Sequence, residues 1–185
     1  MRSDFHLHSS FSADSDAPMR DMVEKGISLG LSAMCFTEHM DYDYIDEGMV
    51  FEADIPSYCK TLTSLKEEYE HKIELLFGLE LGLQPYLKER CESLVKNWDF
   101  DFVIGSSHVV NGQDPYYPAF YEGKEDAPKK SLIFLILNRS LRICIPCPAL
   151  MSTAILIMSS ATVQTKISSI LIKNTVTGWM RSSVF

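Results

Sequence analysis

The chain has 185 residues, a formal net charge of −8 at pH 7 and 46% hydrophobic residues, values typical of a soluble globular protein of one domain. It opens without an apolar leader, and its apolar runs fall short of the ~20 residues that cross a bilayer, so we expect a cytoplasmic protein without a membrane partner. Its basic residues form no patch or stripe, which argues against binding to nucleic acid.

The first 110 residues alternate between apolar strands and amphipathic helices. In chain order we predict strand 3–9, helix 17–31, strand 32–39, helix 57–72, strand 73–83, helix 85–98 and strand 100–110. Nearly continuous apolar strands separated by helices predict a parallel sheet covered by helices, either doubly wound or a (β/α) barrel. No glycine-rich loop follows the first strand, which disfavours a nucleotide-binding unit.

Every predicted strand ends in a residue type that binds metal ions. These residues are His6 and His8 in the first strand, then His39, Glu80 and His108 in the next three. A single histidine is more often a hydrogen-bonded core residue than a ligand. In a barrel, however, the carboxyl ends of the strands converge on one mouth, so four such ends favour a shared site. Imidazole together with carboxylate suits zinc, manganese or iron, and a set this large suggests a multinuclear hydrolytic site.

Four stretches of the chain resemble the metal-binding motifs of one family, in order and in spacing. They are "DFHLHSSFSADSD", "CFTEHMDY", "LLFGLELGL" and "FVIGSSH". The family is the PHP (polymerase and histidinol phosphatase) family, and the similarity is greatest to its monofunctional histidinol-phosphatases. The resemblance runs from Asp4 to about Asp126 and implies an α/β fold, a distorted seven-stranded (β/α) TIM-like barrel. Only its first four β/α units are present, followed by a non-homologous tail.

The resemblance also implies a set of site residues. The family's metal ligands fall on His6, His8, Asp14, His39, Glu80 and His108. Among these, Glu80 would bridge two ions, and Glu80 and His108 would serve catalysis with several divalent ions of zinc, manganese or iron. Asp14 has a second interpretation as a turn aspartate in "SADSD". Asp4 and Glu38 are either carboxylates that fix imidazole tautomers or ordinary surface residues.

The activity implied by the resemblance is hydrolysis of L-histidinol phosphate, a small phosphorylated substrate, to L-histidinol and phosphate in histidine biosynthesis. The ions would hold the phosphate oxygens and activate the attacking water. Two alternatives stay open. One is another PHP phosphoesterase acting on nucleotides or phosphotyrosine, and the other is a non-catalytic metal-binding fragment. The sequence leaves open the oligomeric state and whether the 185-residue chain is itself active.

The charge of the chain changes abruptly near residue 127. Residues 1–126 hold all 25 acidic and 10 of the 17 basic residues, whereas residues 127–185 hold 7 basic residues and no acidic one. Folded domains normally mix both signs. Shifting the reading frame by one base lets "MSTAILIMSSATVQTKI" spell a Gly-His-x-Asp motif that the family carries, and it turns Trp179-Met180 into Asp. We therefore predict a barrel half over 1–126 and an out-of-frame tail without evolved structure over 127–185.

Overall fold

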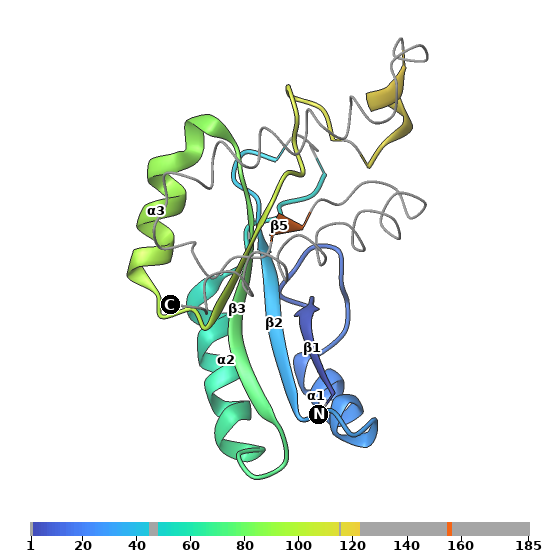
Figure 1. The fold of residues 1–185 in the computed structure, drawn as a ribbon, viewed down its shortest axis with the longest axis vertical. Coiled ribbons are helices and arrows are strands. Elements are labelled where there is room, and N and C mark those ends of the chain that lie inside the picture. The colour runs from blue at the N-terminus through green and yellow to red at the C-terminus, as the bar shows by residue number, and fades with distance from the viewer. Residues whose placement is uncertain (1, 45–47, 115, 123–154, 157–185) are drawn as a thin grey trace, which may run out of the picture.

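A computed structural model describes residues 2–44, 48–114, 116–122 and 155–156, which form a parallel sheet covered by helices (Figure 1). The strands are β1 (Ser3–Leu7), β2 (Ala33–Met40), β3 (Glu74–Gly82), β4 (Phe102–Ser106) and β5 (Ile155–Leu156). They lie side by side in this order, and each pairs in parallel with the next. The predicted α/β class and the four parallel strands of the first half are confirmed.

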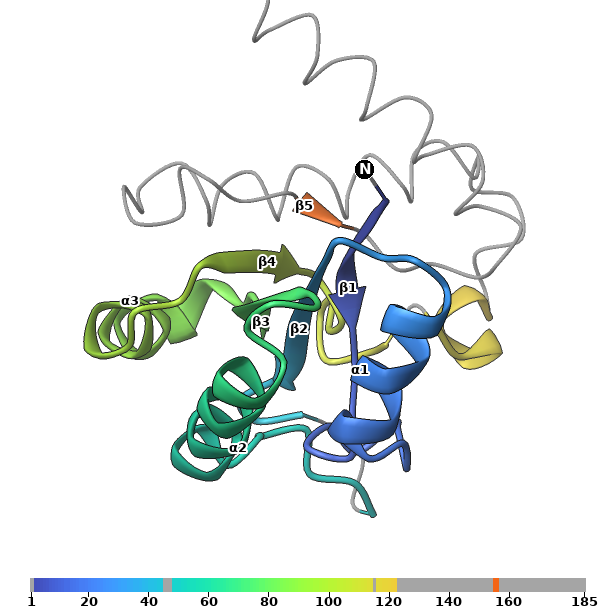
Figure 2. The same ribbon diagram turned by 90° about the horizontal axis from the view of Figure 1, so that it is seen from below.

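Three helices cover one side of this curled sheet (Figure 2). They are α1 (Met19–Ser28), α2 (Ile55–Glu68) and α3 (Lys88–Asn97), the last preceded by a 3-10 turn at Pro85–Leu87. A second 3-10 turn spans Pro118–Tyr121. The helix α2 begins two residues earlier than predicted, because the Asp54 carboxylate accepts the backbone N–H of Ser57 at 3.2 Å and caps the first turn.

The core lies between the sheet and the helices. Leu79 of β3 is fully buried, as are Phe36 of β2 and Leu62 of α2. The hydroxyl of Tyr58, also on α2, donates to the Phe36 carbonyl at 2.8 Å and accepts from the Gly78 N–H at 3.2 Å. The helix α2 is therefore joined to both central strands by a polar contact inside an apolar layer.

Two strands end several residues earlier than predicted. The strand β1 stops at Leu7, after a register shift relative to β2 between Asp4 and Leu7, and β4 stops at Ser106. His8 and His108 therefore lie in the loops that follow the strands rather than within the ladder. In these loops the two imidazoles do not follow the alternation of side chains along a strand, yet they stay at the carboxyl edge of the sheet.

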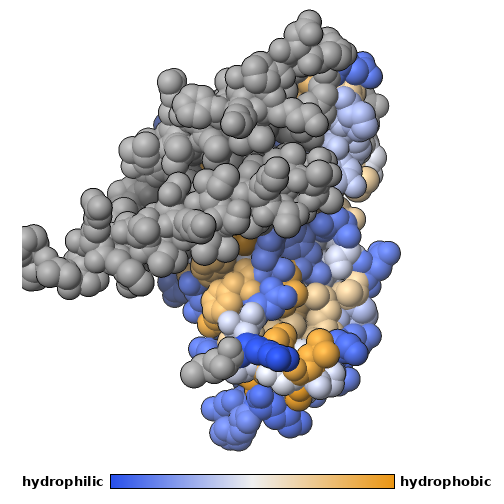
Figure 3. Space-filling view, turned by 45° about the vertical axis from the view of Figure 1, so that its right-hand side comes forward, coloured by the Kyte–Doolittle hydropathy of each residue, from blue (hydrophilic) through white to orange (hydrophobic). Residues whose placement is uncertain are grey.

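The edges of the described sheet differ from its centre. All eight residues of β2 are buried, whereas three of the five residues of β1 are exposed. Apolar side chains show on the surface of the described part in Figure 3, and Phe5 of β1 and Leu29 after α1 are among the exposed large hydrophobic residues. At the other edge, β5 adds a two-residue pairing to β4 that we did not predict, since an open edge accepts any extended segment.

The predicted out-of-frame tail lies almost wholly outside the described residues, so it remains a prediction. Among the described residues, no helix combines the length and apolarity that a bilayer crossing requires.

Candidate metal centre

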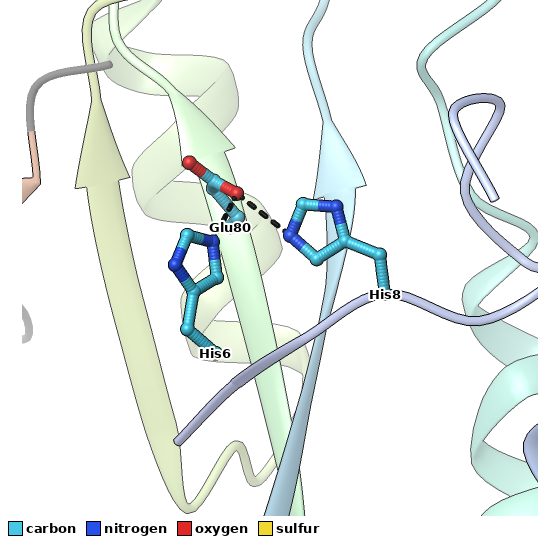
Figure 4. A group of neighbouring side chains, drawn as sticks. All are labelled: His6, His8 and Glu80. Atoms are coloured by element: carbon cyan, nitrogen blue, oxygen red, sulfur yellow. Dashed lines mark hydrogen bonds and ion pairs between the residues drawn. The ribbon is translucent and has the colours of Figure 1, made fainter. Parts of the chain in front are cut away.

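Glu80 stands at the centre of the predicted ligands. It is fully buried on β3 and pairs in register with His39 of β2, so both side chains project from the same face of the sheet. Figure 4 shows the imidazoles of His6 and His8 turned toward it; the Nε2 atom of each lies 2.9 Å from Glu80 Oε2. From the other side, His108 Nε2 lies 3.1 Å from Glu80 Oε1. Both oxygens of one carboxylate are thus faced by ring nitrogens.

Asp14 forms a second meeting point beside the first. Its Oδ2 atom lies 3.1 Å from His8 Nδ1 and 3.5 Å from His39 Nε2. A residue that only shaped the "SADSD" turn would not need to face two imidazoles. The position of Asp14 therefore favours its interpretation as a ligand over that of a turn aspartate.

The side chains form three overlapping groups, each with one possible ligand atom per residue and all such atoms within 4.8 Å of one another. The groups are His6–His8–Glu80, His8–Asp14–His39 and His39–Glu80–His108. Together they contain all six predicted ligands. His71, the fifth histidine, has a side chain that is 92% exposed and lies outside these groups. Each pair of groups shares one residue: His8, His39 or Glu80. Neighbouring ions in a cluster share ligands in the same way.

The charges in the cluster are strongly coupled. Burial alone would raise the pKa of Glu80, but the bonds from the surrounding histidines hold that pKa well below its usual range. For His8, burial alone would lower the pKa, and the carboxylates of Asp14 and Glu80 outweigh it and raise the pKa to about 9. The same balance raises the pKa of His39 and His108.

The donor set fits divalent metal ions. Imidazole nitrogens and carboxylate oxygens are the ligands that zinc, manganese and iron share. The Nε2 atom of His8 is buried and, although close to Glu80 Oε2, makes no hydrogen bond of acceptable geometry. A buried ring nitrogen without such a bond is costly unless something else takes its lone pair. An ion between these side chains would do so.

Glu38 fits neither of the two interpretations we gave it, because among the described residues it bonds no imidazole and it does not lie at the surface. It is fully buried, and its carboxylate accepts the hydroxyls of Ser9 at 2.6 Å and Ser12 at 2.5 Å. The Ser12 oxygen in turn accepts the backbone N–H of His39 at 2.9 Å. Glu38 therefore holds the loop that carries His8 against β2. Asp4, the other residue considered, accepts the backbone N–H of His6 at 3.2 Å and likewise touches no ring.

Two residues of the centre escaped the sequence analysis. Ser106 at the end of β4 donates its hydroxyl to Glu80 Oε1 at 2.6 Å. Asp41, which is 4% exposed, follows β2 and contacts the Nδ1 atoms of both His39 and His108. Its spacing was a usable signal, because a residue two positions after a ligand on an extended segment faces the same side.

A cleft of about 460 Å³ opens beside the cluster, a size suited to a small molecule. His39, His108 and Asp14 of the cluster are part of its lining, together with Asp41. The rest of its described lining is aromatic, acidic, aliphatic or small: Ala13, Ser15, Asp16, Tyr44, Met49, Phe51, Asp114, Tyr116 and Tyr117. No Lys or Arg is found among these described lining residues.

Comparison with known proteins agrees with this geometry. The model of the PHP domain matches residues 4–174, which is most of the chain. The chain belongs to the PHP domain family. The match extends past Asp126 into the predicted tail, where nearly all residues lie outside the described part.

Among curated proteins, histidinol-phosphatase of Lactococcus lactis is 36% identical over 133 residues, which are 70% of this chain and 49% of that protein. The crystal structure of the histidinol phosphate phosphatase from this organism, in complex with zinc, L-histidinol and phosphate, superposes with a TM-score of 0.65. The superposition covers 71% of this chain and 51% of that one, also at 36% identity.

A solved structure from Listeria monocytogenes, 20% identical, has a TM-score of 0.53 over 59% of this chain and 46% of that one, and supports the fold alone. The chain thus spans about half the length of the curated relatives that it matches.

Proposed function

We propose that this chain is half of a metal-dependent phosphomonoesterase that hydrolyses L-histidinol phosphate to L-histidinol and phosphate in the cytoplasm. The observation that carries the proposal is the set of three overlapping ligand groups around Glu80. A relative at 36% identity is named histidinol-phosphatase, and the related crystal structure contains zinc together with both products of this reaction.

In this proposal the six residues His6, His8, Asp14, His39, Glu80 and His108 hold several ions, with Glu80 shared between neighbouring ions and, with His108, closest to the chemistry. Bound divalent ions would supply positive charge for the phosphoryl oxygens and lower the pKa of a water molecule. The chain itself would hold the metal-binding side chains in place. Glu80 is held by Ser106 at 2.6 Å, and the loop carrying His8 is held by Glu38, so the ligands are fixed before substrate arrives.

The lining of the cleft supports an amine-bearing substrate. A phosphate group needs positive charge, and the described lining provides none from Lys or Arg, so ions held by the ligand groups would supply it. The lining also includes an acidic wall, formed by Asp16 and the buried Asp114 among the aromatic rings of Tyr44 and Tyr116. Carboxylates and aromatic faces attract ammonium and imidazolium groups. L-histidinol phosphate has an imidazole ring at the end away from its phosphate and an ammonium group between the two.

The test compares phosphate release from L-histidinol phosphate, a nucleoside monophosphate and phosphotyrosine by the zinc- or manganese-loaded protein with its reading frame restored. A fourth substrate, the same phosphate ester without its ammonium group, measures what the acidic wall contributes. We expect L-histidinol phosphate to give the largest kcat/KM and the amine-free ester a higher KM. Faster hydrolysis of the nucleotide or of phosphotyrosine would assign the protein to another PHP phosphoesterase, and metal binding without release from any substrate would make it a non-catalytic fragment.

We further propose that the residues after about 126 are translated out of frame. What supports this is the segment 127–185 without a carboxylate and the Gly-His-x-Asp motif that appears after a one-base shift. The family match reaches residue 174, so the protein comparison does not locate the slip. Resequencing the gene around codons 120 to 135 does. An early stop codon in the shifted frame, or the absence of the motif there, would contradict the proposal.

A further inference from the structure

Asp41 contacts two histidines from different parts of the chain, His39 on β2 and His108 in the loop after β4. Its Oδ2 atom lies 2.9 Å from His39 Nδ1, and its Oδ1 atom lies 2.6 Å from His108 Nδ1. The carboxylate is 5% exposed, and both imidazole side chains are about one tenth exposed. Each oxygen therefore has its own ring, and water has little access to either contact.

The chemistry of a carboxylate decides which ring nitrogens carry protons. An ionised carboxylate only accepts hydrogen bonds, so each Nδ1 facing Asp41 must be the donor. A neutral imidazole with its proton on Nδ1 has its lone pair on Nε2. For His39 that Nε2 atom faces Asp14 Oδ2 at 3.5 Å, and for His108 it faces Glu80 Oε1 at 3.1 Å.

We propose that Asp41 is a positioning residue that fixes the tautomer and the ring orientation of His39 and His108 together, so that both Nε2 atoms are ready to bind metal. The inference rests on the proposed metal centre but assigns a residue that lies outside the three ligand groups. His39 and His108 share one group with Glu80, and His39 also belongs to the group with Asp14, so one carboxylate acts on ligands of two neighbouring groups. Partners of this kind typically affect metal affinity by about 10- to 100-fold.

The neighbouring strand β3 leaves room for the Asp41 carboxylate at Gly82. Gly82 ends β3, and a Cβ atom placed there would lie 1.9 Å from Asp41 Oδ1 and 3.2 Å from Asp41 Cα. The carboxylate cannot swing away without losing its two imidazoles. Gly82 thus offers an independent way to displace Asp41 without altering its charge, from a residue that is not itself in the ligand groups.

The experiment measures zinc binding by the full 185-residue chain, with a chromophoric chelator as competitor. Asp41→Asn keeps the shape but has only one accepting oxygen, so one of the two rings must reverse its tautomer. We expect the zinc dissociation constant of that site to rise about 10- to 100-fold. Gly82→Ala should give a loss in the same direction. The matched control is Asp43→Asn, which removes the same charge from an exposed residue two positions along the chain.

A second readout needs no variant and separates positioning from a general structural role. In the zinc-loaded wild-type chain, nitrogen-15 NMR should show protons on Nδ1 of both His39 and His108. A proton on Nε2 of either ring would overturn the inference, as would zinc affinity in Asp41→Asn within about twofold of wild type. These measurements use zinc alone. Failure to hydrolyse L-histidinol phosphate would therefore remove the proposed function while leaving the role of Asp41 intact.

Discussion

The two faces of the central strands differ in chemistry although they share one backbone. Toward the helices, Phe36 of β2 and Leu79 of β3 are fully buried in an apolar layer. Toward the other side, Thr37, His39 and Glu80 are also almost fully buried, but two of them are ionisable. Alternation along a strand places these opposite environments one residue apart. Glu80 follows Leu79 directly, so neighbouring substitutions can test stability and metal binding separately.

The buried carboxylate on the polar face requires positively charged groups around it. Burying apolar side chains releases free energy, roughly 25 cal/mol for each Å² removed from water. Burying a carboxylate such as Glu80 costs free energy unless positive groups surround it. Here the imidazoles of His6, His8 and His108 face it. The free energy gained by burying apolar side chains on the helix-covered face therefore offsets the cost of burying charged side chains on the opposite face.

The largest effect is expected from Glu80→Gln on the polar face. The amide keeps the size of the side chain but removes the negative charge that two neighbouring ions would share. Because even residues that only orient a ligand change affinity by about 10- to 100-fold, we expect metal affinity to fall more than about 100-fold, and turnover with it. Metal content after dialysis, together with the rate of phosphate release, measures both quantities in the protein with its reading frame restored.

The matched control for this prediction is His71→Ala. The His71 side chain is 92% exposed and distant from the ligand groups, so metal content and rate should stay close to those of the wild type. Unchanged metal content in Glu80→Gln, with wild-type turnover, would remove Glu80 from the site.

Much of the clustering of the candidate ligands could be predicted from the sequence because it follows two simple regularities. Apolar strands separated by helices gave a parallel sheet, and the carboxyl ends of parallel strands meet at one edge. His39 and Glu80 were therefore expected near each other, and the structure places them in register. Asp14 needed the family resemblance, since its approach to the site depends on the path of a loop.

The supporting contacts were harder to predict. Glu38 was considered as a partner of an imidazole, yet it precedes His39 by one residue and so faces the opposite side of β2, where Ser9 and Ser12 bind it. Asp41 was missed, because its role depends on a second histidine 67 residues away. Strand ends were overestimated at β1, where the alternating pattern continues through Ser9, and at β4, where Val109 and Val110 follow the end of the hydrogen-bonded ladder.

Leu79→Ala should have the next largest effect, and on stability instead of metal binding. Leu79 is fully buried beside Glu80 in sequence but on the helix-covered face. Removing its three outer carbons leaves a cavity, which costs about 2–5 kcal/mol of unfolding free energy. Urea unfolding of the metal-free chain measures the loss. Zinc affinity of the folded protein should change by less than about twofold, and a tenfold weakening would show that the two faces are not independent.

The smallest effect is expected from Tyr58→Phe, which tests the polar contact inside the apolar layer. The Tyr58 hydroxyl donates to the Phe36 carbonyl at 2.8 Å and accepts from the Gly78 N–H at 3.2 Å, and the side chain is fully buried. Its loss leaves buried backbone groups without this partner, at a cost of about 1–3 kcal/mol.

The control is Tyr69→Phe, because the Tyr69 hydroxyl bonds Glu24 and Arg20 near the surface, where water can replace it. Urea unfolding should show a loss of about 1 kcal/mol or more for Tyr58→Phe and less than about 0.5 kcal/mol for Tyr69→Phe. Equal losses would mean that the apolar layer gains nothing from this hydroxyl beyond what a surface hydrogen bond provides.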